Sequence, residues 1–143
     1  MVKSQEDSDD AHPFWYARVL GIFHAQVVHT GPLAKNGSIQ HIEFLWVRWF
    51  GIVKGHKYGP AVARLPKIGF LDETDSSAFG FLDPSLVIRG CHVIPAFADG
   101  RTPDLLTAKA SLGRPIGETD DWLAFYVMMY VVSFYDLKEP LLT

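Results

Sequence analysis

The chain has 143 residues, of which 48% are hydrophobic and 13% aromatic, a composition typical of one packed globular domain and not of a disordered chain. The first ten residues hold Lys3 and four acidic side chains and account for the whole formal net charge of −3. The neutral remainder argues against broad, sequence-independent nucleic-acid binding, which normally requires a basic excess. The single cysteine, Cys91, excludes an internal disulfide framework and a zinc cluster made of this chain's cysteines.

The N-terminal segment MVKSQEDSDD is polar and acidic, unlike a signal peptide or a transit peptide. No apolar run approaches the roughly 20 residues that span a bilayer, so neither a membrane segment nor a membrane partner is expected. We expect three parts: a disordered acidic tail over residues 1–11, a domain over 12–135 and a C-terminal tail over 136–143. The expected location is intracellular.

Residues 14–28 and 39–53 show the alternation of strands with one buried face. In the first stretch, Trp15 and every second residue after it are apolar or small, which assigns that face to the core and Tyr16 to the opposite face. The intervening segment HTGPLAKNGS carries two turn dipeptides, Gly-Pro and Asn-Gly. The sequence therefore predicts an antiparallel hairpin.

The middle of the chain, ARLPKIGFLDETDSS, predicts a short strand interrupted at Pro66 and followed by an acidic turn. Asp83 and Pro84 can open one helical turn, because aspartate caps a helix and proline suits its first position. A strand is expected from Leu86 to Ile94. Two of its side chains are expected to be buried, Ile88 and Val93.

Farther on, a second capping pattern, Thr-Pro-Asp at 102–104, precedes LLTAKASL and Gly113 and predicts a short helix. The last element, from Trp122 to Val132, is apolar on both faces, and its β-branched and aromatic content favours a strand over a buried helix. Several short strands and frequent Gly and Pro predict a mainly β fold. We expect a single small, partly open β-barrel, SH3-like, with one or two short helices.

Catalytic signatures such as H-E-x-x-H, G-x-S-x-G, the P-loop and G-x-G-x-x-G are missing from the sequence. His24 and His41 could face each other across the hairpin and join an aspartate of LDETD in a metal site, which is the less favoured interpretation. Cys91 and His92 point to opposite faces of a strand and make a poor nucleophile–base pair. We assign no catalytic residue, no metal and no cofactor.

Four aromatic residues are candidates for a ligand-binding surface: Tyr16, Trp46, Trp49 and Tyr58. Trp46 and Trp49 are three residues apart on a strand and project from opposite faces, so we expect one to be buried and the other partly exposed beside Tyr16 or Tyr58. An exposed ring of this kind attracts a methylammonium group by about 0.5–2 kcal/mol. The alternative is that all these rings pack in the core.

A basic cluster follows the second strand, without an acidic residue between 53 and 68. Its members are Lys54, Lys57, Arg64 and Lys67. They could offer auxiliary contacts to an acidic partner or to nucleic acid, although such charges usually only keep a loop solvated.

The strings HPFWYARVLGIFHAQV, FLWVRWFG, FGFLDPSLVIRGCHVIPAFADGRT and DDWLAFYV resemble a domain of uncharacterised proteins from mushroom-forming fungi, commonly encoded by DNA transposons of the Plavaka type. The resemblance covers roughly His12 to Val131; beyond it, VSFYDLKEPLLT departs from the fungal pattern, which suggests a shortened or rewritten C-terminus. More loosely, FWYARVLGI, VRWF and LVIRGCHVI are similar to bromo-adjacent homology (BAH) domains. That similarity implies a β-barrel used in chromatin binding.

The sequence favours a non-catalytic, transposon-related interaction module that binds a protein or peptide, such as a histone tail, through its aromatic surface. Nucleic acid is a less favoured partner, and a chromatin partner would place the protein in the nucleus. Two alternatives stay open. One is a small metal-dependent enzyme or nuclease accessory that uses histidine and aspartate, and the other is a structural or oligomerising fragment.

Overall fold

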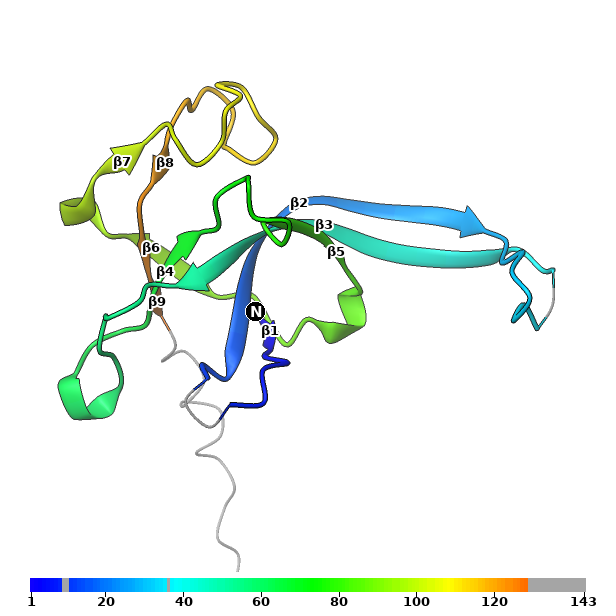
Figure 1. Cartoon of the computed structure of the whole chain (residues 1–143), viewed down its shortest axis with the longest axis horizontal. Coiled ribbons are helices and arrows are strands. Elements are labelled where there is room, and N and C mark those ends of the chain that lie inside the picture. The colour runs from blue at the N-terminus through cyan, green and yellow to red at the C-terminus, as the bar shows by residue number, and fades with distance from the viewer. Residues whose placement is uncertain (9–10, 36, 129–143) are drawn as a thin grey trace, which may run out of the picture.

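The structure, a computed structural model, describes residues 1–8, 11–35 and 37–128. One antiparallel sheet runs in the order β1-β2-β3-β4-β9-β6, with β5 pairing β3 as a seventh strand, and β7 pairs β8 separately. The strands are β1 (Val2–Lys3), β2 (Phe14–Val27), β3 (Gln40–Ile52), β4 (Lys67–Phe70), β5 (Phe79–Leu82), β6 (His92–Pro95), β7 (Arg101–Thr102), β8 (Asp121–Trp122) and β9 (Phe125–Met128). The sheet curls without closing (Figure 1), which confirms a mainly β, partly open barrel.

Helical structure in the described residues consists of three 3-10 turns, η1 (Pro60–Val62), η2 (Pro84–Leu86) and η3 (Phe97–Asp99). The turn η2 is the one predicted, and the side chain of Asp83 accepts a hydrogen bond from the backbone N–H of Ser85 at its start. The prediction of a helix after residue 104 is wrong, because residues 103–120 form turns and bends between β7 and β8. Arg114 donates to three backbone carbonyls of this segment, which stabilises a non-helical path.

The predicted hairpin is confirmed: β2 and β3 pair antiparallel from Tyr16 opposite Phe50 to Val27 opposite Gln40. The assignment of its faces is wrong, since Tyr16 is only 2% exposed and Trp15 is partly exposed. A bulge between residues 19 and 21 shifts the register, so the face that Tyr16 occupies continues through odd-numbered residues farther along β2. A single period-two pattern could not describe both halves of the strand.

The core lies on the inner face of the curled sheet. Its buried members are Tyr16, Ile68, Phe70, Phe125 and Val127. The strand predicted to be interrupted at Pro66 instead begins directly after it, as β4, and the backbone N–H of Val127 donates to the Pro66 carbonyl. Strands far apart in the sequence are thereby packed around one aromatic cluster.

The prediction of a disordered tail is wrong for the first residues of the chain. Val2 is buried, pairs with Trp15 of β2 and bridges to Val87, so residues 1–8 belong to the fold. Residues 87–89 also run alongside the start of the chain, where the Met1 amino group donates to the Arg89 carbonyl and the Ile88 N–H donates to the Met1 carbonyl. Residues 136–143 lie outside the described part of the chain.

The predicted strand from Leu86 to Ile94 is reduced to β6, which starts at His92. Ile88 and Val93 are 52% and 37% exposed, so the prediction that both are buried is wrong. Ile88 lies outside any strand, and β6 is an edge strand that pairs only with β9 among the described strands. The barrel is therefore open at this edge.

The last apolar segment forms strands as expected up to residue 128, although it is divided into β8 and β9. The remainder of the predicted strand, residues 129–132, lies outside the described residues. No helix in the described ranges is long and apolar enough to cross a membrane.

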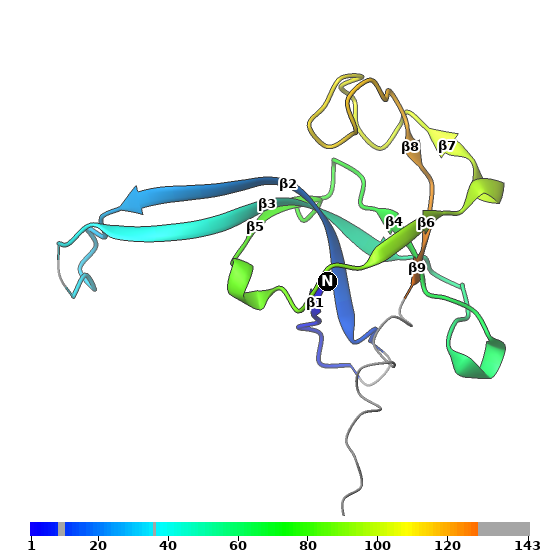
Figure 2. The same cartoon turned by 180° about the vertical axis from the view of Figure 1, so that it is seen from behind.

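A lobe formed by residues 97–123 carries β7 and β8 and is tied to the sheet by buried charges. The Asp121 carboxylate accepts from Nη1 of Arg48 at 2.8 Å and from Nε of Arg114 at 3.1 Å. The Arg48 guanidinium also lies 3.8 Å above the Phe70 ring. In Figures 1 and 2 the lobe lies above β4, β6 and β9, whereas the outer half of the β2–β3 hairpin extends sideways away from them.

Candidate functional site

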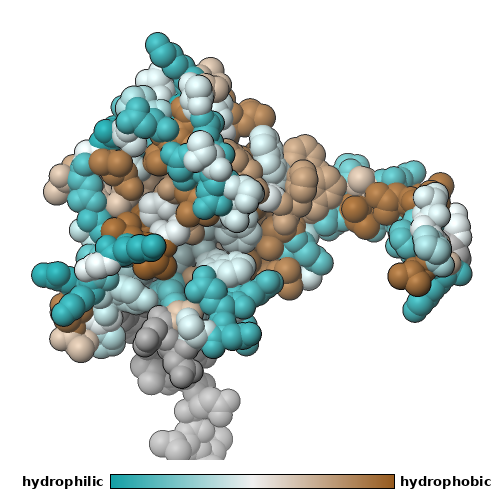
Figure 3. All heavy atoms as spheres, viewed as in Figure 1, coloured by the Kyte–Doolittle hydropathy of each residue, from teal (hydrophilic) through white to brown (hydrophobic). Residues whose placement is uncertain are grey.

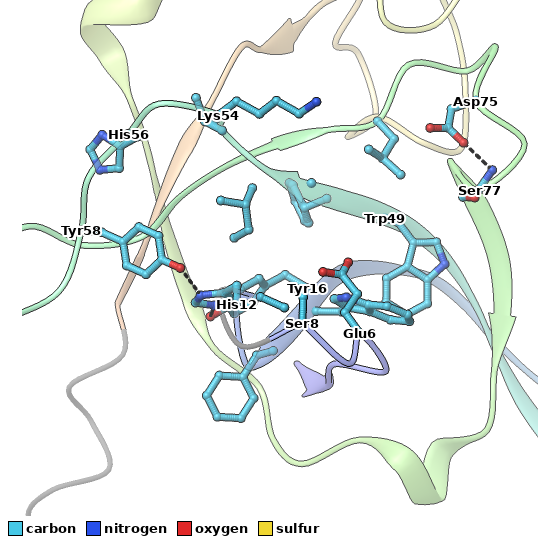
Figure 4. Close-up of a pocket in the computed structure, with 18 of the residues that line it drawn as sticks. Glu6, Ser8, His12, Tyr16, Trp49, Lys54, His56, Tyr58, Asp75 and Ser77 are labelled. Carbon is cyan, nitrogen blue, oxygen red and sulfur yellow. Dashed lines mark hydrogen bonds between the residues drawn. The ribbon is translucent and has the colours of Figure 1, made fainter.

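A pocket of about 910 Å³ opens between the start of β2, the end of β3 and the loop that follows β3 (Figure 4). Its volume falls in the range of about 300–1,000 Å³ that is usual for ligand pockets. Seven of its twenty lining residues are aromatic: Phe14, Trp15, Tyr16, Trp49, Phe50, Tyr58 and Phe79. The pocket is therefore an apolar cavity with polar groups placed among aromatic rings.

Two tryptophans from neighbouring strands form one part of the wall. Trp49 lies opposite Ala17 in the register, so Trp15 is its diagonal neighbour on the same face. The two rings meet edge to face with centroids 6.1 Å apart, and both are partly exposed. Gly80 leaves space for the Trp49 indole, because a Cβ at that position would lie 3.0 Å from its Nε1 atom.

His12 joins two tyrosines at the floor of the pocket. Its Nδ1 lies 2.8 Å from the Tyr58 hydroxyl and its Nε2 lies 2.8 Å from the Tyr16 hydroxyl. Burial lowers the pKa of His12 and, more than any other cause, raises the pKa of Tyr16. A neutral imidazole donates to one hydroxyl and accepts from the other, which holds Tyr58 and its loop against β2.

Charged groups of both signs reach the same pocket. Glu6, Asp75 and Lys54 are among its lining residues. The Asp75 carboxylate also accepts from the backbone N–H of Ser77 at 2.8 Å, which fixes its position in the turn (Figure 4). Aromatic faces and carboxylates together suit a ligand that carries a positive charge.

Three of the four predicted aromatic residues line this pocket: Tyr16, Trp49 and Tyr58. Trp46 does not line it and packs against Phe79, with ring centroids 6.2 Å apart. The prediction that one tryptophan of the Trp46–Trp49 pair is buried is wrong, because both are partly exposed. Tyr16 is buried and forms part of the floor, so it does not present an exposed platform.

The basic residues are divided between different surroundings. Lys54 lines the aromatic pocket, whereas Arg64 lines a second hollow of about 500 Å³ together with His56 and Tyr126. Lys67 forms an ion pair with Asp99 at 2.6 Å, and that hydrogen bond raises the pKa of Lys67. Lys57 is exposed. These side chains do not line a common cavity.

The histidines considered for a metal site do not face each other directly. The register places His24 opposite Glu43 and His41 opposite Gln26. Within the described ranges, no group of three His, Cys, Asp or Glu side chains is arranged to hold a metal ion. Cys91 packs against the core cluster.

Sequence reasoning missed most of the lining residues, among them Glu6, His12, Trp15 and Asp75. Glu6 was assigned to a disordered tail and Trp15 to the core face. A signal for Trp15 exists in the string FWY at 14–16, because three successive rings on a strand cannot all face one core. No family model, curated protein or solved structure matches the chain.

Proposed function

We propose that this chain is a non-catalytic interaction module whose aromatic pocket binds an extended segment of a protein partner. The observation that carries the proposal is the edge-to-face pair of Trp15 and Trp49 on the wall of the 910 Å³ pocket. Large rings that are only partly covered by their own chain can bury further area against a ligand. The hydrogen bonds of His12 hold Tyr58 in place before a ligand arrives.

The proposed ligand is a lysine side chain carrying methyl groups, as in a histone tail. A methylammonium group gains from aromatic faces by cation–π attraction and loses less hydration than an unmodified ammonium. The carboxylates of Glu6 and Asp75 add charge attraction, and the same carboxylates oppose the phosphates of a nucleic acid. Lys54 supplies an auxiliary contact to an acidic residue of the partner.

In this proposal the domain is related to the fungal transposon-encoded domain and, more distantly, to BAH domains. A chromatin partner places its action in the nucleus. The resemblance motivates the choice of histone-tail peptides as probes, and the lining of the pocket motivates the choice of methylated lysine.

The test is a titration of the whole chain with histone-tail peptides that contain unmodified or trimethylated lysine. Tryptophan fluorescence or calorimetry measures the binding. We expect the trimethylated peptide to bind more tightly. Trp49→Ala should weaken its binding by about 2- to 30-fold, which corresponds to the ~0.5–2 kcal/mol of one cation–π contact.

The matched control is Trp46→Ala, which removes the same side chain from the same strand outside the pocket. This variant should bind the trimethylated peptide as tightly as the protein with the original sequence does. Thermal melts should show that both variants are folded. The proposal fails if neither peptide binds, or if the two variants lose affinity to the same extent.

A further inference from the structure

The outer half of the β2–β3 hairpin forms a two-stranded arm, defined as residues 21–27 of β2 and residues 40–44 of β3, in which Phe23 lies opposite Phe44 and Val27 opposite Gln40. The strand β1 pairs with β2 only at Phe14 and Trp15, and β5 pairs with β3 only from Leu45 onward. Among the described residues, no strand pairs with either outer edge of the arm, which extends away from the sheet in Figures 1 and 2. Its backbone N–H and C=O groups on those edges are open to another strand.

An aromatic ridge runs along one face of the arm. Phe23 stacks on Phe44 with ring centroids 5.5 Å apart, and Phe44 meets Phe81 edge to face at 5.4 Å. Phe81 is 73% exposed, and Figure 3 shows hydrophobic surface along the arm. Gly21 makes room for the ridge, because a Cβ there would lie 2.5 Å from the Phe23 ring.

The two edges of the arm differ in charge. The outer strand formed by residues 40–44 carries Glu43, and a charged residue on an edge strand opposes pairing with another chain. Residues 21–27 read GIFHAQV and contain no Asp, Glu, Lys or Arg, and Ile22 is 77% exposed. The β2 edge is therefore the unprotected one.

The charge of the whole arm also limits its partner. Between residues 20 and 45 the only formal charges are Lys35 and Glu43, which cancel. Strands that enter a groove of DNA need basic side chains to meet the phosphates, so a nucleic acid does not fit. The strand that fits is extended, uncharged and apolar at alternate positions, and residues 21–27 themselves have this chemistry.

We infer that the open edge of β2 in the arm pairs antiparallel with the same edge of a second copy of this chain about a two-fold axis. A two-stranded ribbon is marginally stable in water, whereas joining two arms gives four strands with one apolar face. Directly opposite residues of antiparallel strands share a face, so the two aromatic ridges lie on the same side. Each favourable contact occurs twice, and two neutral arms do not repel each other. This inference is independent of the pocket.

The experiment is sedimentation equilibrium of the whole chain from about 1 µM to about 500 µM, the range in which a micromolar dimer forms. We expect the mass to rise from 16.0 kDa toward twice that value. Ile22→Lys should stay monomeric, because a lysine on an edge strand opposes pairing with another chain. Its melting temperature at low concentration should equal that of the unmodified chain, since Ile22 is exposed.

The matched control is Ile116→Lys, which adds the same charge at a fully exposed position of the lobe and should leave dimer formation unchanged. The inference is overturned if the unmodified chain remains at 16.0 kDa throughout, or if Ile22→Lys dimerises as well as the unmodified chain.

Discussion

Replacing Asp121 by Asn removes a carboxylate that lies between two buried arginines while it keeps the size of the side chain. Asp121 is 4% exposed and accepts from Arg48 at 2.8 and 3.2 Å and from Arg114 at 3.1 Å. Arg48 is fully buried, and its Nε atom has no hydrogen-bond partner among the described residues. The variant therefore leaves two guanidinium groups in the interior without the charge that balances them.

The expected loss of stability is about 3–5 kcal/mol, the usual cost of removing one partner of a buried ion pair. Because two arginines pair with Asp121, the loss of stability should lie toward the upper end of this range. The loss is limited because the Gly113 carbonyl still accepts from Arg48 and three other carbonyls still accept from Arg114. A domain of this size is held together by about 5–15 kcal/mol, so the variant loses a large share of its stability.

Urea unfolding followed by tryptophan fluorescence measures this change. With a slope of about 2 kcal/mol per molar urea, the midpoint should fall by about 1.5–2.5 M. Glu118→Gln is the matched control, because it neutralises a carboxylate that pairs with Arg101 at the surface, and its midpoint should not change measurably. If Asp121→Asn lowers the midpoint by less than about 0.5 M, the buried charges do not hold the lobe to the sheet.

Gly69→Ala should lower the free energy of unfolding by about 1–3 kcal/mol, because the added methyl group would lie 2.8 Å from the backbone oxygen of Leu123. The control in the same urea measurement is Gly37→Ala, where the added methyl group meets no atom within 4 Å. Burial lowers the pKa of His12 below 6.5, so the unfolded chain binds a proton at this side chain more readily than the folded chain does. The folded state therefore loses stability as the pH falls from about 6.5 toward the lowered pKa. Between pH 7.5 and 5 the melting temperature should therefore fall more in the unmodified chain than in His12→Gln, and equal falls would contradict this.

Features set by neighbouring residues were predictable from the sequence. Alternation and two turn dipeptides predicted the β2–β3 hairpin, and the pair Asp83-Pro84 predicted the turn η2. The hydrogen bonds that define these features join residues of one turn or one hairpin. Alternation along the second strand also placed Trp49 among the candidates for an aromatic surface, and Trp49 lines the pocket.

The tertiary structure decided which side chains meet across the chain. The bulge after Val19 reversed the faces of β2, so Tyr16 became core and Trp15 joined the pocket wall. Arg114 finds its carbonyl partners in turns, where the capping pattern at residues 102–104 had predicted a helix. Glu6 reaches the pocket because β1 is paired to β2. Each outcome depends on packing between segments distant in sequence, and a pattern of neighbouring residues does not contain that information.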